Sequence, residues 1–402
     1  MNPLAKHRTV FTIGVFLIIA IAATVAIFWA RGFKPNIKTG KIDRTGLLVA
    51  NSTPTGAQVY LDDRLTSATN TSIAYLDPKT YHVRIEKEGY TKWEKDVNVV
   101  ADLATEIKAL LFPQAPEIKP LTTTGAANPT LSPDGTKIIY GTTGEHGGLY
   151  VLPMVDSPFA FRQNSRLIAK NSANFDFSKA KFIWDPDSKQ VIAQLVGDRV
   201  ANLLMDTEKT DQQANDITAS LSATLSSWQQ QIDLGAQTLS GTIPDEVKGA
   251  TAAAKVATSP SPSPTPKTKA SSPTIQLSNY PTILNYHPNG VTFSPSEEKI
   301  LYQNKDEKYK IYDLKLKKEY TLPDFADFIT ISWYPDSDHL VVAQKDLISI
   351  IETDGTNKVT VYSGKFEDGF VFAHPSATRL IILTTLTQTE GTPTNLYSIN
   401  LR

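Results

Sequence analysis

The feature that most constrains the fold of this 402-residue chain is a proline turn that recurs five times after residue 117. The five segments align without a gap, and an apolar run follows each of them. They are LSPDG at 131–135, WDPDS at 184–188, FSPSE at 293–297, WYPDS at 333–337 and AHPSA at 373–377. Proline fixes φ and lacks an N–H, so it belongs in a turn rather than in a central strand. The pattern predicts repeated strand–turn–strand units.

The spacing of the units favours a closed ring of small sheets. Pro295, Pro335 and Pro375 are 40 residues apart, which is a propeller-blade period. Third strands are expected at 148–151, 310–314 and 396–399. A blade normally has four strands, and the last unit ends at Leu401 after three. Residues 118–121, ahead of the first unit, can supply the missing outer strand and remove an open sheet edge.

The turn segments resemble the TolB-type repeats of PD40 and WD40-like proteins, whose signature is an aromatic residue followed by Ser-Pro-Asp-Gly. The segment at 131–135 matches best and the segment at 373–377 least. The resemblance covers about residues 120–402 apart from one insertion, and it implies a β-propeller. We therefore predict a mainly β chain whose residues 114–402 form a five-bladed propeller. A sixth blade, too divergent to recognise, is the alternative.

The insertion is predicted at residues 207–280, between Pro186 and Pro295. Residues 215–235 have the periodicity of an amphipathic helix. Its apolar stripe consists of Ile217, Leu221, Leu225, Trp228 and Ile232. Asn215 or Asp216 is expected to cap its start and Gly235 to end it. We expect the helix to pack on the propeller, and docking of a partner protein is the alternative.

The second part of the insertion has a different composition. Residues 251–273 contain five prolines and no aromatic residue. A segment of this kind cannot bury enough apolar surface to fold, so we predict that it is disordered and exposed.

A smaller β domain is predicted at residues 45–113. Short strands are expected at 47–50, 57–61, 81–86 and 97–100, with turn residues between them. Alternating apolar side chains, such as those of Val59 and Leu61, fall on one face of a strand. The segment is therefore predicted to form a small antiparallel sandwich.

Short motifs in this segment resemble the PEGA domain. They are PTGA at 54–57, VYLDD at 59–63 and EGY at 88–90, with Trp93 three residues later. The resemblance implies an envelope-associated module without catalytic activity. Tyr60, Tyr90 and Trp93 are the candidate binding residues, because their rings can form a sugar-stacking surface. The alternative is that they fill the core of a small domain, where aromatic residues dominate burial.

The N-terminus is predicted to be a membrane anchor. Residues 9–30 carry no charge over 22 positions, a length that spans the hydrocarbon core of a bilayer. Residues 1–8 are then a cytoplasmic tail and residues 31–44 a juxtamembrane linker. The basic residues after residue 30 outnumber those before residue 9, which favours a cytoplasmic C-terminal side. The domain types favour the opposite orientation, and we expect the C-terminal domains outside the cell.

Composition limits the chemistry. The net charge of −1 gives no electrostatic reason to expect nucleic-acid binding, and the lack of cysteine excludes thiol chemistry and disulfides. No phosphate-binding loop or hydrolase motif is present, so no cofactor is expected. The paired Asp residues of the turns are expected to serve the turns rather than calcium. A site shared by His287, His339 and His374 is not expected, and no metal is predicted.

The predicted function is binding or scaffolding by a non-enzymatic, single-pass protein of the cell membrane. Its expected partners are the membrane and a cell-wall glycan or an envelope protein, including a surface layer. Two alternatives stay open: a purely structural envelope spacer, and a glycan-acting hydrolase or lyase whose acids line the propeller channel. Candidate acids for such an enzyme are Asp324, Asp327 and Asp368.

Overall fold

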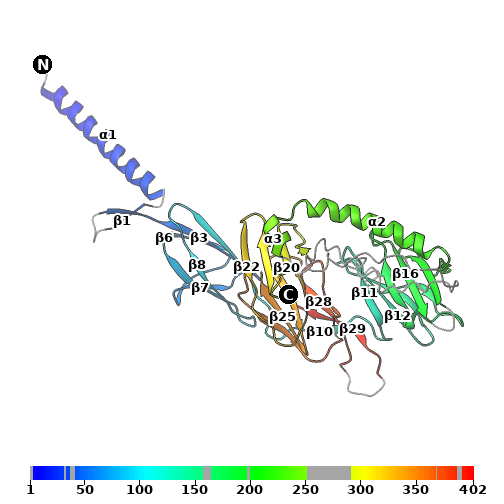
Figure 1. Ribbon diagram of the computed structural model, residues 1–402. Coiled ribbons are helices and arrows are strands. Elements are labelled where there is room, and N and C mark those ends of the chain that lie inside the picture. Colours follow the sequence, from blue (N-terminus) through cyan, green and yellow to red (C-terminus); the bar gives the residue numbers. More distant parts are fainter. Residues whose placement is uncertain are drawn as a thin grey trace. The chain divides into compact units, whose positions relative to one another are not determined.

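The computed structural model describes residues 3–30, 33–36, 41–156, 164–196, 200–250, 291–367, 369–386 and 392–402. Over these residues the chain is mainly β, as predicted (Figure 1). It divides into two compact units, Met1–Gln114 and Ala115–Arg402. The predicted disordered segment 251–273 lies outside the described residues.

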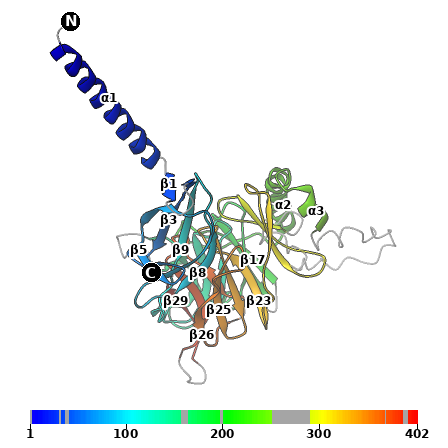
Figure 2. The same ribbon diagram turned by 90° about the vertical axis from the view of Figure 1, so that its left-hand side faces the viewer.

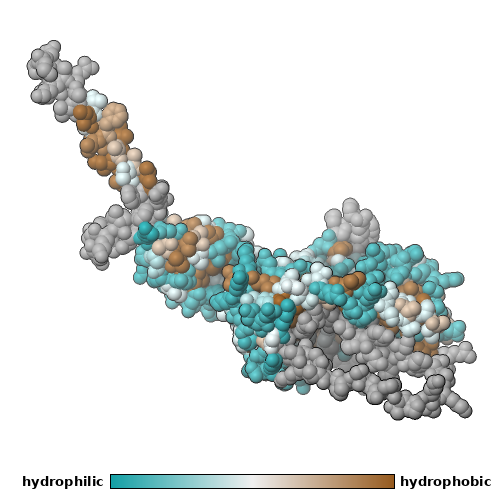
Figure 3. Space-filling view, turned by 45° about the horizontal axis from the view of Figure 1, so that its top comes forward, coloured by the Kyte–Doolittle hydropathy of each residue, from teal (hydrophilic) through white to brown (hydrophobic). Residues whose placement is uncertain are grey.

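The N-terminal helix α1 covers Pro3–Ala30 and includes the predicted span 9–30. Its described side chains, residues 11–27, are exposed and mainly apolar (Figure 3). A search of the described part of the chain finds no helix with the length and hydropathy needed to cross a membrane. The anchor therefore stays a prediction. The segment predicted as a linker contains a hairpin of β1 (Phe33–Asn36) and β2 (Lys41–Arg44).

The rest of the first unit is a sandwich of two sheets. One layer has the order β6 (Thr71–Leu76), β3 (Gly46–Thr53) and β9 (Ala104–Leu110). The other has the order β5 (Arg64–Ala68), β4 (Gln58–Leu61), β7 (Thr80–Glu86) and β8 (Trp93–Asn98). Alternate residues of β3, β4 and β7 point inward and form one apolar core between the layers.

One strand pair corrects the prediction of a fully antiparallel sandwich. β9 runs parallel to β3, in register from Leu47 opposite Ala104 to Thr53 opposite Leu110. The chain crosses from β8 in one layer to β9 in the other layer, where β9 pairs with β3. This pair is therefore not a hairpin of two strands that follow each other in the chain. Apolar alternation shows which face of a strand is buried but not the direction in which the strand runs, so this parallel pair was not predictable from it.

The described residues of the second unit form five four-stranded antiparallel sheets, each of the size of a propeller blade. Figures 1 and 2 show how these sheets are arranged. Sheet 1 is β11 (Ala127–Leu131), β12 (Lys137–Thr142), β13 (Gly148–Pro153) and β14 (Arg166–Lys170). Sheet 2 follows the 3-10 turn η2 (Phe177–Lys179) and is β15 (Lys181–Trp184), β16 (Gln190–Val196), β17 (Val200–Asp206) and β18 (Asn215–Asp216).

The other three sheets consist of strands after residue 290, except for β10 (Ile118–Pro120) in sheet 5. Sheet 3 is β19 (Val291–Phe293), β20 (Lys299–Gln303), β21 (Tyr309–Asp313) and β22 (Lys318–Thr321). Sheet 4 is β23 (Phe328–Trp333), β24 (His339–Gln344), β25 (Leu347–Glu352) and β26 (Val359–Ser363). Sheet 5 is β10, β29 (Asn395–Asn400), β28 (Arg379–Thr384) and β27 (Val371–Ala373), in that order.

Sheet 5 confirms that the segment before the first repeat completes the last sheet. β10 pairs antiparallel with β29, with Ile118 opposite Ile399. The core next to this pair joins Ile138 and Leu152 of sheet 1 to Ile381 and Leu396 of sheet 5. Residues from the two ends of the second unit are therefore held together both by strand pairing and by apolar packing.

The five proline turns share one backbone geometry. In each, the residue before the proline donates its N–H to the carbonyl of the residue four after the proline, at 2.8–3.0 Å. The residue two after the proline has a positive φ in every turn. These residues are Gly135, Ser188, Glu297, Ser337 and Ala377. The gapless alignment thus reflects a fixed hairpin loop in which the left-handed position suits glycine best.

In the chain, two described helices of the insertion come between the strands of sheet 2 and those of sheet 3. α2 (Leu221–Ser240) packs Leu225 and Trp228 against Ile183 and Ile192 of sheet 2. α3 (Asp245–Ala250) packs Val247 against residues of sheet 3 that include Ile300 and Tyr302. Figure 1 shows α3 beside β20 and α2 extending toward β16. The apolar stripe is therefore buried against the chain's own sheets, as predicted.

The bounds of this helix correct the prediction of 215–235. Asn215 and Asp216 form β18 on the edge of sheet 2, and the Asp216 carboxylate accepts a hydrogen bond from the Thr218 N–H at 2.9 Å. The residue before the helix is Ser220, whose side chain makes no capping hydrogen bond. Gly235 lies inside α2, which ends before Gly241. Pairing with β17 therefore takes the two residues that were expected to cap the helix.

Candidate binding surfaces

The three predicted binding residues do not form one surface. Trp93 begins β8 and points into the sandwich core, where only 3% of its surface is exposed. Tyr60 lies between the inward-facing Val59 and Leu61 of β4, so its ring is on the outer face of the same sheet. Tyr90 is half-buried beside the core. Filling of the core therefore accounts for Trp93 fully and for Tyr90 in part.

Tyr60 belongs to a polar strip on the outer face of β4 and β7. The Arg84 guanidinium lies 4.3 Å from the centre of its ring, and the two residues are directly opposite each other in the sheet. The Tyr60 hydroxyl donates to Oε1 of Gln58 at 2.7 Å. Gln58 is in turn opposite Glu86. The strip therefore leads from Tyr60 to the end of β4 at Gln58.

A surface depression of about 550 Å³ opens at that end of β4. Its lining is Gly56, Gln58, Glu86, Lys87, Glu88, Tyr90, Lys92 and Gln114. The tight turn at 87–90 positions Tyr90: its N–H donates to the Lys87 carbonyl at 3.0 Å, and Gly89 has a φ of +79°. Gln114 holds the turn from the other side, because its Nε2 donates to the Tyr90 carbonyl at 3.0 Å.

Most of the charges in this depression already have partners. Arg84 donates to Glu86 at 2.5 Å, Lys87 donates to the Thr55 carbonyl at 2.5 Å, and Lys92 pairs with Glu94 at 3.0 Å. Two lysines and two glutamates line the depression, so its formal charge is zero. The remaining neutral groups are the Gln58 amide N–H, the Gln114 amide oxygen and the Tyr90 hydroxyl.

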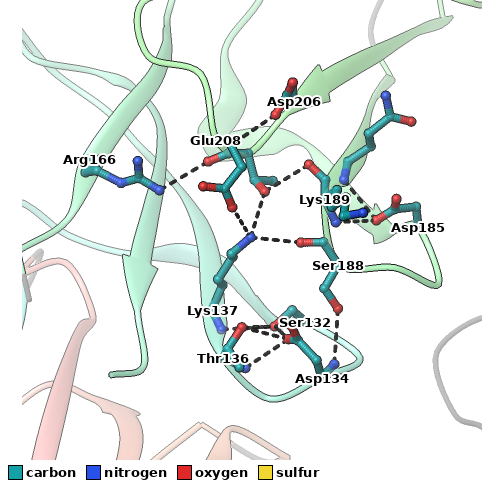
Figure 4. A network of polar contacts seen from close by, with 12 residues as sticks. Ser132, Asp134, Thr136, Lys137, Arg166, Asp185, Ser188, Lys189, Asp206 and Glu208 are labelled. Carbon is teal, nitrogen blue, oxygen red and sulfur yellow. Dashed lines mark hydrogen bonds and ion pairs between the residues drawn. The ribbon is translucent and has the colours of Figure 1, made fainter. Parts of the chain in front are cut away.

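A second polar cluster joins sheets 1 and 2 (Figure 4). Lys137 follows the first turn, and its side chain is only 17% exposed. Its ammonium donates to the Ser188 carbonyl at 3.0 Å and pairs with Glu208. The Ser188 hydroxyl accepts the N–H of Asp134 at 3.1 Å. The turn of one sheet is thus fastened to the turn of the next.

Two carboxylates in this cluster are shifted in opposite directions. Burial acts to raise the pKa of Asp134, but hydrogen bonds from Ser132 and Thr136 outweigh it and leave that pKa below its ordinary value. Burial raises the pKa of Asp185, although its carboxylate accepts the N–H groups of Lys189 and Gln190 at 2.8 and 2.9 Å. Both carboxylates therefore bond within their own turns, which is the role that was predicted for Asp185.

The junction of sheets 3 and 4 repeats these contacts. Lys299 donates to the Ser337 carbonyl at 3.1 Å and pairs with Asp338, while the Ser337 hydroxyl accepts the Ser296 N–H at 2.9 Å. An indole N–H adds a further bond at each junction, from Trp184 to the Thr130 carbonyl and from Trp333 to the Thr292 carbonyl. The sequence shows the repeated lysine and serine but not which sheet each side chain reaches.

The junction of sheets 5 and 1 uses a different arrangement. Arg379 donates to Asp156 at 2.9 Å and to Nε2 of His374 at 2.8 Å. His374 is 1% exposed. Burial, with the nearby Arg379 charge, lowers the pKa of this imidazole to about 4. Asp156 lies four residues after the apolar Leu152 and outside any motif, so its role was not predictable from the sequence.

The remaining candidates are the acids named for an enzyme and the three histidines considered for a metal site. Asp324 pairs with Lys308 at 2.6 Å, and the Asp327 carbonyl accepts the Lys345 N–H at 2.9 Å. Asp368 and His287 lie outside the described residues. His339 bonds to Asp336 at 2.7 Å. Within the described ranges, no group of three or more His, Asp or Glu side chains is arranged to hold a metal ion.

Comparisons with known proteins address the two units. No curated protein matches the chain. Putative TolB from Agrobacterium tumefaciens is similar in structure at 11% identity and a TM-score of 0.24, over 71% of this chain and 77% of that one. TolB from Acinetobacter baumannii is similar at 10% identity and a TM-score of 0.24, over 80% of this chain and 59% of that one. Residues 45–114 match the family described as the PEGA domain, so the first unit contains a PEGA domain where the motifs predicted it.

Proposed function

We propose that this chain is a non-enzymatic binding or scaffolding protein of the cell envelope. In this proposal the five sheets are the blades of a propeller, which β10 completes and in which α2 and α3 fill the junction between blades 2 and 3. The observation that carries the proposal is that side chains of the proline turns bond to neighbouring sheets. Lys137, Lys299 and Arg379 are bound to neighbouring sheets, which suits a rigid platform.

The proposal places the chain at the membrane, with both β units on the outer side. Its support is the uncharged run at 9–30 and the exposed apolar side chains of residues 11–27. Apolar side chains that remain exposed along a whole helix need an apolar surrounding. Protease treatment of intact cells tests the orientation. The expected result is that the β units are digested while cytosolic proteins survive. Full protection of the β units from the protease contradicts the proposed orientation.

Retention on cell-wall material tests the function. The full chain in mild detergent is incubated with purified cell-wall material, and the bound fraction and any released products are measured. Retention without released oligosaccharide is the expected result. No retention, combined with weakened envelopes after deletion of the gene, indicates a structural spacer. Released oligosaccharide indicates a glycan-acting enzyme, and Asp324→Asn and Asp327→Asn then test the candidate acids.

A further inference from the structure

We propose that the depression at the Gly89 turn of the PEGA domain, extended along β4 to Tyr60, binds a neutral glycan built from N-acetylated amino sugars. This inference rests on the proposed function and names the ligand class and the site. The depression has the volume of a small-molecule site, within the usual range of about 300–1,000 Å³. Its lining mixes one aromatic ring with polar groups.

The charge pattern selects a neutral ligand. The depression has no net charge, and Glu86, Lys87 and Lys92 already bond to groups of the same domain. A strongly charged ligand would meet like charges on this lining, the two lysines for a cation and Glu86 with Glu88 for an anion.

Two side-chain amides of the lining have atoms that no described residue bonds, and these atoms favour a ligand that carries an amide group. Gln58 accepts the Tyr60 hydroxyl with its oxygen, and its amide N–H groups have no bond within the described residues. Gln114 donates its amide N–H to Tyr90, and its amide oxygen has no bond within the described residues. One donor and one acceptor are therefore offered on the same surface. An acetamido group presents the complementary pair, one C=O and one N–H.

Tyr90 supplies apolar contact in the depression, and Tyr60 adds the part of its ring that Arg84 does not cover. Tyr90 is half-buried in the depression, and Tyr60 lies two residues along β4, a rise of about 7 Å. The C–H face of a pyranose packs on an aromatic ring, and phenol hydroxyls bond to sugar hydroxyls. The strip is thus suited to more than one sugar unit of a chain.

Binding of N-acetylglucosamine oligomers to the full chain in detergent tests this inference. We expect the tetramer to bind, a matched glucose oligomer without acetamido groups to bind about tenfold more weakly, and added salt to have little effect. Gln58→Ala and Tyr90→Ala should each weaken binding about tenfold. Gln237→Ala, on the exposed face of α2, is the control and should bind as the wild type does.

The outcomes separate this site from the proposed function. Gln58 is exposed, so its variant tests the site even if Tyr90→Ala unfolds the domain. Wall retention without binding of the oligomers, or with full binding by Gln58→Ala, overturns the glycan site and leaves the proposed function standing. Equal binding of the glucose oligomer overturns the acetamido selection. Absence of both wall retention and oligomer binding overturns both proposals.

Discussion

Sheets 1 and 2 contain the same proline turn, but the contacts between sheets 1 and 2 differ from those on the other side of sheet 2. Between sheets 1 and 2, Lys137 reaches the carbonyl of Ser188, and Trp184 packs in the shared core. On the other side, the position equivalent to Lys137 is Gln190, and sheet 2 packs on α2. The repeat therefore fixes the turn, while the residue four after the proline depends on what lies beside it.

The largest effect is expected from a variant that removes the packing of α2 on sheet 2. Trp228 is 6% exposed between α2 and sheet 2, so Trp228→Ala should cost about 3–5 kcal/mol of unfolding free energy. Hydrogen exchange of the full chain should become faster in sheet 2 and stay unchanged in sheet 4. Ser227→Ala, at the exposed neighbouring position, is the control. Unchanged exchange in sheet 2 would contradict the role of α2 as its packing partner.

The next effect is a pH dependence at the junction of sheets 5 and 1. The folded pKa of His374, about 4, lies below its unfolded value of about 6.5. The unfolded chain therefore binds the proton first, and stability falls as the pH drops from about 6.5 to about 4, by up to about 3 kcal/mol. Chemical unfolding at pH 7, 5.5 and 4 measures the loss.

The variant His374→Asn should remove this part of the pH dependence, because no group at that position titrates. A wild-type curve that is flat over this interval, or a variant that keeps the full loss, would count against a neutral imidazole at the junction.

Much of the fold was predictable because local chemistry determines it. The five turns follow from proline and a left-handed position, and the completion of sheet 5 by β10 follows from counting strands. The parallel pairing of β9 and the start of α2 at Leu221 were not predictable, because they depend on which strand lies alongside. At the candidate site, the sequence identified Tyr60 and Tyr90. It also proposed Trp93, which lies in the core, and it missed Gln58 and Gln114. Gln114 acts only through the position of the 87–90 turn.

A smaller effect tests the lysine-bonded junctions. Lys137→Met and Lys299→Met each leave a turn carbonyl and a carboxylate without this donor, and each should cost about 1–3 kcal/mol. Because the two sites share no residue, the double variant should lose the sum to within about 0.5 kcal/mol. Thermal unfolding measures all three. Gln190→Met, where α2 replaces the neighbouring sheet, is the matched control and should change little.

The smallest effect concerns the left-handed position of the turns. Glu297 is exposed with a φ of +58°, so Glu297→Gly should relieve backbone strain and stabilise the unit by about 0.5–1 kcal/mol. Ser188 has the same φ, but Ser188→Gly also removes the hydroxyl that accepts the Asp134 N–H. The loss of about 1 kcal/mol for that bond should cancel the gain. Equal stabilisation by both variants would mean that the serine bond contributes nothing to the junction of sheets 1 and 2.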